Sequence, residues 1–342
     1  MNITKLYPPK NNSFVLDNLP FRSMTLFGAL ANCFVTLYGD EKFPEFIEQF
    51  ENGSVGSLFP ALKINDKEIF FFPKPYLSKV QNKDDKDGII FKKKIKKIRW
   101  LSYNAMKIFG NSIKNIDGEY YHSVDFLQDF DLIGGEFLIA KNELKPEIIN
   151  KLSSVDFYKK KDNIRVYIPR FDKDSKPFTQ SEISLINRKL FFKKNKFVSI
   201  EMFLYFPDSI DDNEKWVATK QLLIDEGIGG KRHLGKGYFR KIDTVEAPFD
   251  SNDNPKLFLL LSNLIPKKEE LENILSYDIG TDDGYITHGY ASTYKKDKIF
   301  FLKEGAVIDK IIDGKIVSQE FKDNKIYRYG RAYLFPMGVK DE

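Results

Sequence analysis

The chain has 342 residues, a length typical of two domains, and a formal net charge of +5, so any strongly basic surface must be local. Its one cysteine, Cys33, excludes an intrachain disulfide and a zinc site built from cysteines, and its place in an apolar helix predicts a core residue. The first residues form no apolar leader, and no run reaches about 18 apolar residues. We therefore expect a cytoplasmic protein without a signal peptide, a membrane span or a membrane partner.

The N-terminal region predicts a strand over residues 3–7 and a helix over residues 21–39. Ser23 is the expected N-cap of this helix, and Gly39 is a natural stop. The helix dipole and the free N–H groups of the first turn suit an anion.

Three residues at this helix start, Arg22, Ser23 and Thr25, are therefore expected to contact an anionic ligand. Gly28 lies inside the helix, where glycine costs roughly 1 kcal/mol relative to alanine. It indicates either close packing on a sheet or the close approach of a ligand.

A short helix over 43–50 and a strand over 68–72 continue the expected first domain, residues 1–145. Residues 78–135 differ in character and are expected to be an insertion on that domain rather than part of its core. Within the insertion, residues 91–100 place lysines on one helical face and apolar side chains on the other. Three interpretations remain open for this stretch: a solvated face, a contact with nucleic acid or a partner, and a helix on a membrane surface.

Residues 146–342 are expected to form a second domain. Its predicted strands are 165–170, 183–192, 197–206, 238–245, 256–264, 285–294, 299–308 and 327–336, and its predicted helices are 146–152, 213–227 and 267–276. The acidic loop 277–286 does not match calcium-loop spacing, so no metal site is predicted. Strand, helix, strand, strand, helix, strand recurs in each half, which predicts an α+β fold of two ferredoxin-like (RRM-like) domains.

The most distinctive stretch is 227–240, GIGGKRHLGKGYFR, in which glycines alternate with cations and no acid occurs. Glycine permits positive φ and close backbone approach, and basic side chains attract phosphate. The stretch therefore predicts a loop that holds a polyanion. Its expected contact residues are Gly227, Gly229, Gly230, Lys231, Arg232, His233, Gly235, Lys236 and Gly237.

Two other interpretations of this loop compete with that one. Residues 230–237 nearly match a nucleotide-binding P-loop, but Gly237 stands where a hydroxyl would bind Mg²⁺, and the helix before and strand after reverse the usual order. A surface loop without function is the simpler alternative. Five glycines cost backbone entropy when they are ordered, which argues against it.

The glycine-rich stretch within such a fold resembles the RAMP superfamily of CRISPR effector proteins. The segments FRSMTLFGALANCFVTLYG, FFPKPYL, RVYIPR and YRYGRAYLFPM narrow the resemblance to the family of the fourth subunit of type III-A (Csm) complexes, over about residues 1–340. The resemblance implies a non-catalytic crRNA-binding subunit that holds the repeat-derived 5′ handle. It also implies that the subunit joins the backbone RAMP subunit to the large polymerase-like subunit in antiviral defence.

The same resemblance implies a protruding thumb, and the insertion at 78–135 is the candidate for this thumb or for the surface that meets the large subunit. No cofactor, metal or catalytic residue is expected. Arg165 and Arg170 would extend the basic track of the loop. The alternatives are a RAMP endoribonuclease that processes precursor crRNA, for which His233 is the weak candidate, the equivalent subunit of a type III-B complex, and a scaffold without an RNA role.

Overall fold

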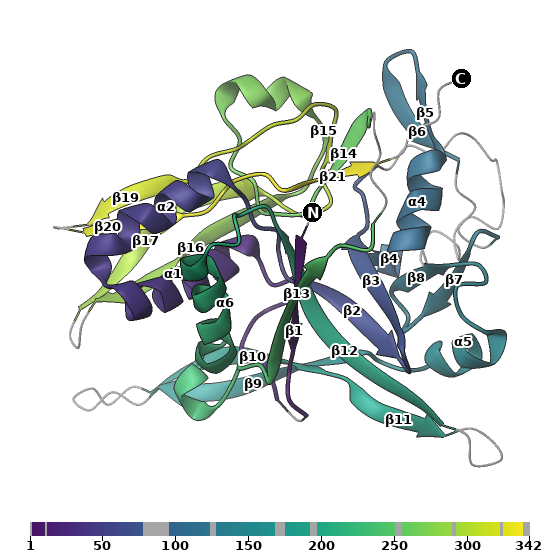
Figure 1. The fold of residues 1–342 in the computed structure, drawn as a ribbon, viewed down its shortest axis with the longest axis horizontal. Coiled ribbons are helices and arrows are strands. Elements are labelled where there is room, and N and C mark those ends of the chain that lie inside the picture. Colours follow the sequence, from purple (N-terminus) through teal and green to yellow (C-terminus); the bar gives the residue numbers. More distant parts are fainter. Residues whose placement is uncertain are drawn as a thin grey trace.

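The computed structural model describes residues 2–10, 12–77, 96–123, 128–167, 175–191, 197–249, 255–288, 292–321 and 324–337. Helices and strands are both present, so the α+β class predicted from the sequence is confirmed (Figure 1). Arg170 and the first half of the basic stretch 91–100, residues 91–95, lie outside the described residues. No helix among the described residues is long and apolar enough to cross a membrane.

One end of the largest sheet is formed by four strands, in the order β13 (Lys241–Glu246), β1 (Asn2–Tyr7), β12 (Phe197–Asp208) and β2 (Phe59–Ile64). Each neighbouring pair is antiparallel, and Thr4 lies opposite both Phe206 and Thr244. Helix α1 (Ser23–Tyr38) follows β1, and α6 (Glu214–Glu226) connects β12 to β13. Strand, helix, strand, strand, helix, strand in this spatial order is the ferredoxin-like arrangement.

This ferredoxin-like unit is assembled from both halves of the chain. Strands β12 and β13, which the sequence pattern assigned to a second domain, pair directly with β1 and β2. The boundary expected between residues 145 and 146 therefore does not coincide with a break in the sheet. Sequence spacing could not reveal this, because Thr4 and Phe206 are about two hundred residues apart.

The same sheet continues from β2 through β3 (Lys67–Pro73), β4 (Trp100–Ser102), β8 (Phe137–Ala140) and β7 (Phe130–Ile133). Helix α4 (Tyr103–Asn111) follows β4, and its N-cap Ser102 accepts a hydrogen bond from the backbone N–H of Ala105 at 3.1 Å. Trp100, Phe109 and Phe130 are buried in the main core. The expectation that 78–135 lies outside the core is therefore wrong for these described residues.

The other elements between β4 and residue 157 are small. A hairpin of β5 (Ile113–Ile116) and β6 (Glu119–His122) follows α4, and the short helix α5 (Pro146–Leu152) packs beside β7. His122 is buried on this hairpin, and burial, reinforced by the charge of Lys74, lowers its pKa to about 4. Such a histidine stays neutral at physiological pH.

The C-terminal part forms a second sheet in the order β15 (Ile274–Ser276), β18 (Val307–Ile308), β14 (Leu257–Leu260) and β21 (Leu334–Met337). Two ribbons accompany it, β16 (Ile279–His288) with β17 (Ser292–Leu302) and β19 (Val317–Phe321) with β20 (Asn324–Arg328). The helix predicted over 267–276 is wrong, because the chain forms a single 3₁₀ segment, η4 (Lys268–Asn273), and then a strand. Residues 255–337, where described, contain no α-helix, unlike the ferredoxin-like unit.

One aromatic cluster joins the two sheets. Tyr329 stacks on Phe27 of α1 at 5.5 Å between ring centroids and meets Phe50 of α2 (Phe43–Asn52) edge-on at 5.6 Å. Its hydroxyl donates to the carbonyl of Val55 and accepts from the N–H of the same residue. Burying each such ring contributes roughly 2–3 kcal/mol, so the C-terminal sheet is fixed firmly over the helices.

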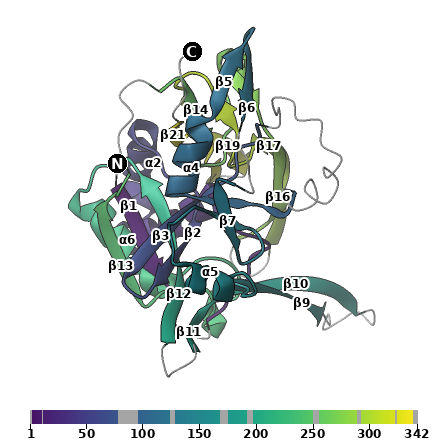
Figure 2. The same cartoon turned by 90° about the vertical axis from the view of Figure 1, so that its right-hand side faces the viewer.

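A long two-stranded ribbon extends from the body of the molecule (Figures 1 and 2). It pairs β9 (Tyr158–Tyr167) with β10 (Lys176–Leu185) in antiparallel register. Ile164 and Val166 are 78% and 53% exposed on it, so its outer part presents apolar side chains to solvent. Strand β11 (Asn187–Phe191) follows and forms with β12 the hairpin that the sequence predicted.

Candidate nucleic-acid interface

The glycine-rich loop connects α6 to β13, as the sequence predicted. At its base, the backbone N–H of Ile228 donates to the carbonyl of Gly237 at 2.9 Å, and Gly227 and Gly237 have φ of +67° and +78°. A Cβ on Gly237 would lie 2.1 Å from the carbonyl oxygen of Ile228. Glycine is therefore required here by the close approach of the chain to itself.

The tip of the loop is exposed. Lys231 adopts φ +58°, a 3₁₀ turn η3 (Arg232–Leu234) follows, and Gly235 returns the chain with φ +71°. Lys231, His233 and Leu234 are exposed, and a Cβ on Gly235 would meet nothing within 4 Å. Nothing in the described structure covers this tip, so a ligand can reach it.

Residues 12–16, which form no recognisable motif in the sequence, hold the loop in place. The carbonyl of Val15 accepts from the N–H of Gly230 at 3.0 Å, and that of Ser13 accepts from the N–H of Gly237 at 3.0 Å. On the other side of this segment, Phe14 and Ile183 of β10 exchange two backbone hydrogen bonds of 2.8 Å. The segment therefore places the loop and the base of the ribbon side by side.

Charges cross the same junction. The ammonium of Lys236 donates to the hydroxyl of Ser13 at 2.7 Å and lies 3.2 Å from a carboxylate oxygen of Glu182 in β10. Arg165 of β9 approaches the other oxygen of Glu182 at 3.9 Å. Partial burial opposes ionisation of Glu182, but the hydrogen bond and charge of Lys236 outweigh it, so the pKa of this carboxyl lies below its usual value.

Two of the four cations predicted to hold phosphate are therefore already paired. Arg232 lies 3.4 Å from a carboxylate oxygen of Glu226 at the end of α6, and Lys236 is held by Glu182. The loop has no acid of its own, but the fold supplies acids from neighbouring elements. Lys231 and His233 form no ion pair with any described residue, so they are the basic side chains of the loop that remain for a ligand.

The start of α1 differs from the expectation. Ser23 is fully buried, its N–H donates to the hydroxyl of Ser57 at 2.8 Å, and its own hydroxyl accepts from the N–H of Asn263 at 2.8 Å. Arg22 is the N-cap, without a side-chain capping bond. Ser23 therefore joins α1 to the C-terminal sheet, and its predicted roles as N-cap and as an anion contact are both wrong.

The other residues predicted on α1 have different surroundings. Arg22 is exposed, and its guanidinium lies 5.1 Å from the ring centroid of Phe301 and 3.4 Å from the carbonyl of Thr281. Thr25 is half-buried. A Cβ on Gly28 would meet nothing within 4 Å, so close packing does not explain this glycine and open space lies beside the helix.

Helix α1 packs along α6, whose C-terminal end leads into the glycine loop. Burial raises the pKa of Cys33 on α1 to about 12, with Glu226 adding to the increase and Arg232 opposing it. These electrostatic effects fall off with distance, so both charged groups lie close to the helix. Arg22 contacts Phe301 and Thr281 rather than the loop, and Arg170 lies outside the described residues.

His233 is the histidine of the loop and is exposed at its tip. His233 makes no hydrogen bond to a described residue, and the side chain of His288 is not among the described ones. In the described part of the chain, no group of three or more His, Cys, Asp or Glu side chains could hold a metal ion. The loop forms a basic surface whose backbone conformation depends on its glycines.

Comparisons with known proteins match both parts of the chain. The model of the RAMP superfamily matches residues 15–240, and the model of the CRISPR Csm4 C-terminal domain matches residues 253–337. The CRISPR system protein Csm4 of Methanocaldococcus jannaschii is 28% identical, over 94% of this chain and 91% of that protein.

Solved structures give the same result. A chain in the crystal structure of the Csm3–Csm4 subcomplex of a type III-A CRISPR-Cas interference complex superposes with a TM-score of 0.68 and 25% identity, covering 99% of this chain and 100% of that one. A chain of a Csm1–Csm4 cassette in complex with cA4 has the same fold, with a TM-score of 0.55, 16% identity and coverage of 100% and 99%. The chain thus belongs to the RAMP superfamily, and it is a Csm4-like member of it.

Proposed function

We propose that the chain is a non-catalytic crRNA-binding subunit of a type III-A (Csm) interference complex in antiviral defence. It holds the repeat-derived 5′ handle of the guide and joins the backbone RAMP subunit to the large polymerase-like subunit. Its Csm4-like sequence supports the place in the complex, since similar chains were solved together with Csm3 and with Csm1. The loop geometry supports the RNA role.

The observation that carries the RNA role is the exposed tip of the glycine loop. Lys231 and His233 present basic, hydrogen-bonding groups to solvent from a turn. The glycines of this turn let a sugar–phosphate backbone come close. Single-stranded RNA also exposes base edges that such side chains read. The open space beside Gly28 and the exposed guanidinium of Arg22 supply the second wall.

The paired cations have a supporting role. Lys236 pairs with Glu182 and so fixes the ribbon base against the loop, whereas Arg165 meets the same carboxylate from within the ribbon. Arg232 fixes the loop to the end of α6. A loop held in this way loses less conformational entropy when RNA binds. Its contribution to affinity is preorganisation rather than direct charge.

The ribbon of β9 and β10 is our candidate for the thumb, in place of 78–135. It extends from the body beside the glycine loop, to which Ser13, Phe14 and Val15 tie it (Figure 1). Its exposed Ile164, Val166 and Phe178 are apolar, and apolar side chains that enter a nucleic acid unstack neighbouring bases. Such a ribbon is suited to wedge beside the guide where the handle ends.

Binding of a 3′-labelled handle RNA from the repeat of the same CRISPR array tests the proposal. Affinity is measured by fluorescence anisotropy over a series of salt concentrations, for the wild type, for Lys231→Ala with His233→Ala, and for the exposed control Lys151→Ala. Removing one phosphate contact should make the negative slope of log affinity against log salt shallower by about 0.7. An identical slope and affinity in all three proteins would mean that RNA does not use this loop.

The assembly role needs a separate test. Co-expression with the backbone and large subunits of the same system should yield one complex that contains all three proteins and crRNA. Recovery of the other two subunits as a stable pair with this chain left free would contradict the linking role while leaving the RNA result untouched.

A further inference from the structure

The hairpin of β11 and β12 carries two exposed phenylalanines, one where β11 ends and one where β12 begins. Phe191 and Phe197 lie opposite each other in the antiparallel register, and they are 69% and 49% exposed. Their ring centroids are 6.4 Å apart, with an angle of 56° between the ring planes. Large apolar side chains gathered on one surface indicate a contact with a ligand or a partner.

The register of the hairpin sets this exposure. Val198 and Ile200 of β12 are buried in the main core, and Leu190 of β11, which lies opposite Val198, packs against that core. Successive side chains of a strand point to opposite faces, so Phe191 and Phe197 lie on the outer face of the hairpin. A slip of one residue would exchange the two faces and expose the core side chains. The outward rings are therefore a fixed feature of the fold.

The same hairpin is basic. Arg188 and Lys189 of β11 are exposed, and neither forms an ion pair with a described residue. The ammonium of Lys189 lies 4.4 Å from the centroid of the Phe197 ring. The acid of this part of β12, Glu201, is already paired with Arg240. Uncompensated positive charge beside exposed rings complements a polyanion that carries flat bases, which is the chemistry of a nucleic acid with unpaired bases.

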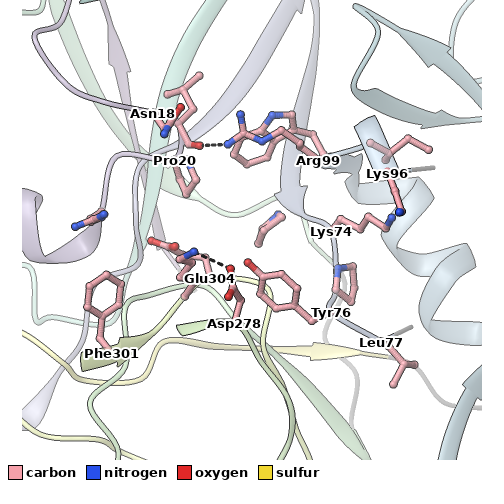
Figure 3. A pocket seen from close by; sticks show the side chains of 17 residues that line it. Asn18, Pro20, Lys74, Tyr76, Leu77, Lys96, Arg99, Asp278, Phe301 and Glu304 are labelled. Atoms are coloured by element: carbon pink, nitrogen blue, oxygen red, sulfur yellow. Dashed lines mark hydrogen bonds and ion pairs between the residues drawn. The ribbon is translucent and has the colours of Figure 1, made fainter. Parts of the chain in front are cut away.

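The hairpin branches from the ribbon of β9 and β10 at a single residue, Ile186. The N–H of Ile186 donates to the carbonyl of Phe157, and its carbonyl accepts from the N–H of Met202 in β12, both at 2.8 Å. Arg99, in the wall of the pocket drawn in Figure 3, donates at 3.1 Å to the hydroxyl of Tyr158, the first residue of β9. These contacts fix the branch point, and the two hairpins diverge from it in Figure 1. A strand on the outer face of the β11–β12 hairpin therefore lies apart from one on the ribbon.

A hydroxyl beside the rings favours RNA over DNA. Ser199 lies opposite Lys189 on the same face as Phe197, is partly exposed, and its hydroxyl makes no hydrogen bond to a described residue. The backbone N–H of Ser199 donates to the side chain of Asn65 at 3.0 Å, and its carbonyl accepts from the N–H of Asn65 at 2.9 Å. The backbone is thus held while the hydroxyl stays available. Such a group can bond a ribose 2′-OH, which distinguishes RNA from DNA.

We infer that the outer face of the β11–β12 hairpin binds an unpaired stretch of RNA other than the handle. Bases stack on Phe191 and Phe197, a ribose lies at Ser199 and a phosphate lies on Lys189. Because every base has a flat face, stacking tolerates any sequence, so the site takes a single strand without reading it. A duplex keeps its bases stacked on one another and offers none to the rings. The hairpin site is separate from the glycine loop, and either can be lost without the other.

The probe is a single-stranded RNA of about twelve nucleotides, unrelated to the handle, with 5-iodouridines that crosslink under light to rings on which they stack. Wild-type protein should give crosslinked peptides that contain Phe191 or Phe197. Phe191→Ala with Phe197→Ala should lose that crosslink and bind the RNA on the order of ten-fold more weakly. Wild-type protein should bind this RNA more tightly than DNA of the same sequence, and Ser199→Ala should lose the preference. Phe300→Ala is the matched control, since Phe300 is 62% exposed beside Lys298 on β17, and should behave like the wild type.

The outcomes separate the hairpin from the loop. Crosslinks confined to the glycine loop or to the β9–β10 ribbon overturn the hairpin site and leave handle binding intact. A hairpin crosslink in a wild-type protein that does not bind handle RNA supports the hairpin site and removes the proposed handle role. Equal affinity for RNA and DNA overturns the assignment to RNA. No crosslink, together with failure of the phenylalanine double variant to co-purify with the other subunits, makes the hairpin a protein contact instead. Thermal melting of each variant shows that it is folded.

Discussion

The ammonium of Lys236 in the glycine loop lies 3.2 Å from a carboxylate oxygen of Glu182 in the ribbon. The two residues are 54 positions apart in the chain, and Ser13 completes the contact from a third segment. A lysine that looks like a phosphate ligand in the sequence is therefore a fixed part of the loop's support. This separates the cations that hold the loop from those that remain for RNA.

Replacing Lys236 should destabilise the protein modestly. Lys236→Ala leaves Glu182 with the more distant Arg165, so we expect a loss of about 1 kcal/mol in the free energy of unfolding, less than for a fully buried pair because Lys236 is about one-third exposed. Urea denaturation of Lys236→Ala, Glu182→Gln and the double variant measures the coupling. Lys241→Ala is the control, since its pair with Asp243 is exposed and should contribute under about 0.5 kcal/mol. A coupling energy of zero would contradict the supporting role.

Two glycines of the loop offer a matched comparison. Both have left-handed φ, but a Cβ on Gly237 would meet the carbonyl of Ile228 at 2.1 Å, whereas one on Gly235 would meet nothing within 4 Å. Gly235→Ala should therefore cost only about 1 kcal/mol for the backbone conformation. Gly237→Ala should cost roughly 3 kcal/mol or more, since it adds a steric clash that opens the loop base. Similar urea midpoints for the two variants would show that the loop base can move apart without cost.

The sequence predicted local structure well where the signal itself was local. Four predicted elements depend on near neighbours in the sequence and are confirmed in the structure. They are the strand at Ile3, the helix through Cys33, the hairpin before Phe206 and the glycine loop. The pairing of β1 with β12 and β13, and the placement of Glu182 beside the loop, depend on contacts between distant segments. Such contacts leave no periodic pattern, which is why one sheet was divided into two domains and why the acids that pair with the loop's cations were not predicted.

Ser23 illustrates the same limit at the candidate site. A serine before an apolar helical run ordinarily indicates an N-cap, but here the hydroxyl accepts from the backbone of Asn263, 240 positions away. Only the fold reveals that the C-terminal sheet covers this helix start. Lys231 is exposed, as a contact residue must be, and Gly28 is half-buried with open space where a Cβ would lie.

Gly28 allows a test of where RNA runs along α1. Gly28→Ala should stabilise the protein by roughly 1 kcal/mol, because alanine favours the helix and its methyl group enters open space. Gly28→Glu places a negative charge in the same space and should weaken handle RNA binding several-fold while the protein stays folded. Thr36→Glu, exposed two turns further along the helix, is the control and should bind RNA like the wild type. Equal affinity of both glutamate variants would move the RNA path away from this helix.

A buried charge cluster beneath the sheet should make stability depend on pH. Asp208 is fully buried, accepts from the hydroxyl of Thr4 at 3.2 Å and lies 3.9 Å from the ammonium of Lys220. Burial, partly offset by Lys220, raises the pKa of Asp208 to about 6 from an ordinary 3.8. The folded state therefore binds this proton more tightly than the unfolded state, so the stability from this group is complete below about pH 4 and declines as pH rises towards 6.

The size of this effect follows from the pKa difference and is roughly 3 kcal/mol at most. Urea denaturation of the wild type and of Asp208→Asn between pH 4 and pH 7 measures it, because the asparagine variant lacks the titrating group and should show a flatter profile by that amount. Glu45→Gln provides a surface comparison of opposite sign: hydrogen bonds from Lys215 and Lys42 hold the pKa of Glu45 below its usual value, so this variant should lose only a small rise of stability with pH, at the acid end of the range. Parallel profiles for the wild type and Asp208→Asn would mean that Lys220 keeps Asp208 ionised throughout, so that the pair acts as a permanent ion pair between α6 and β12.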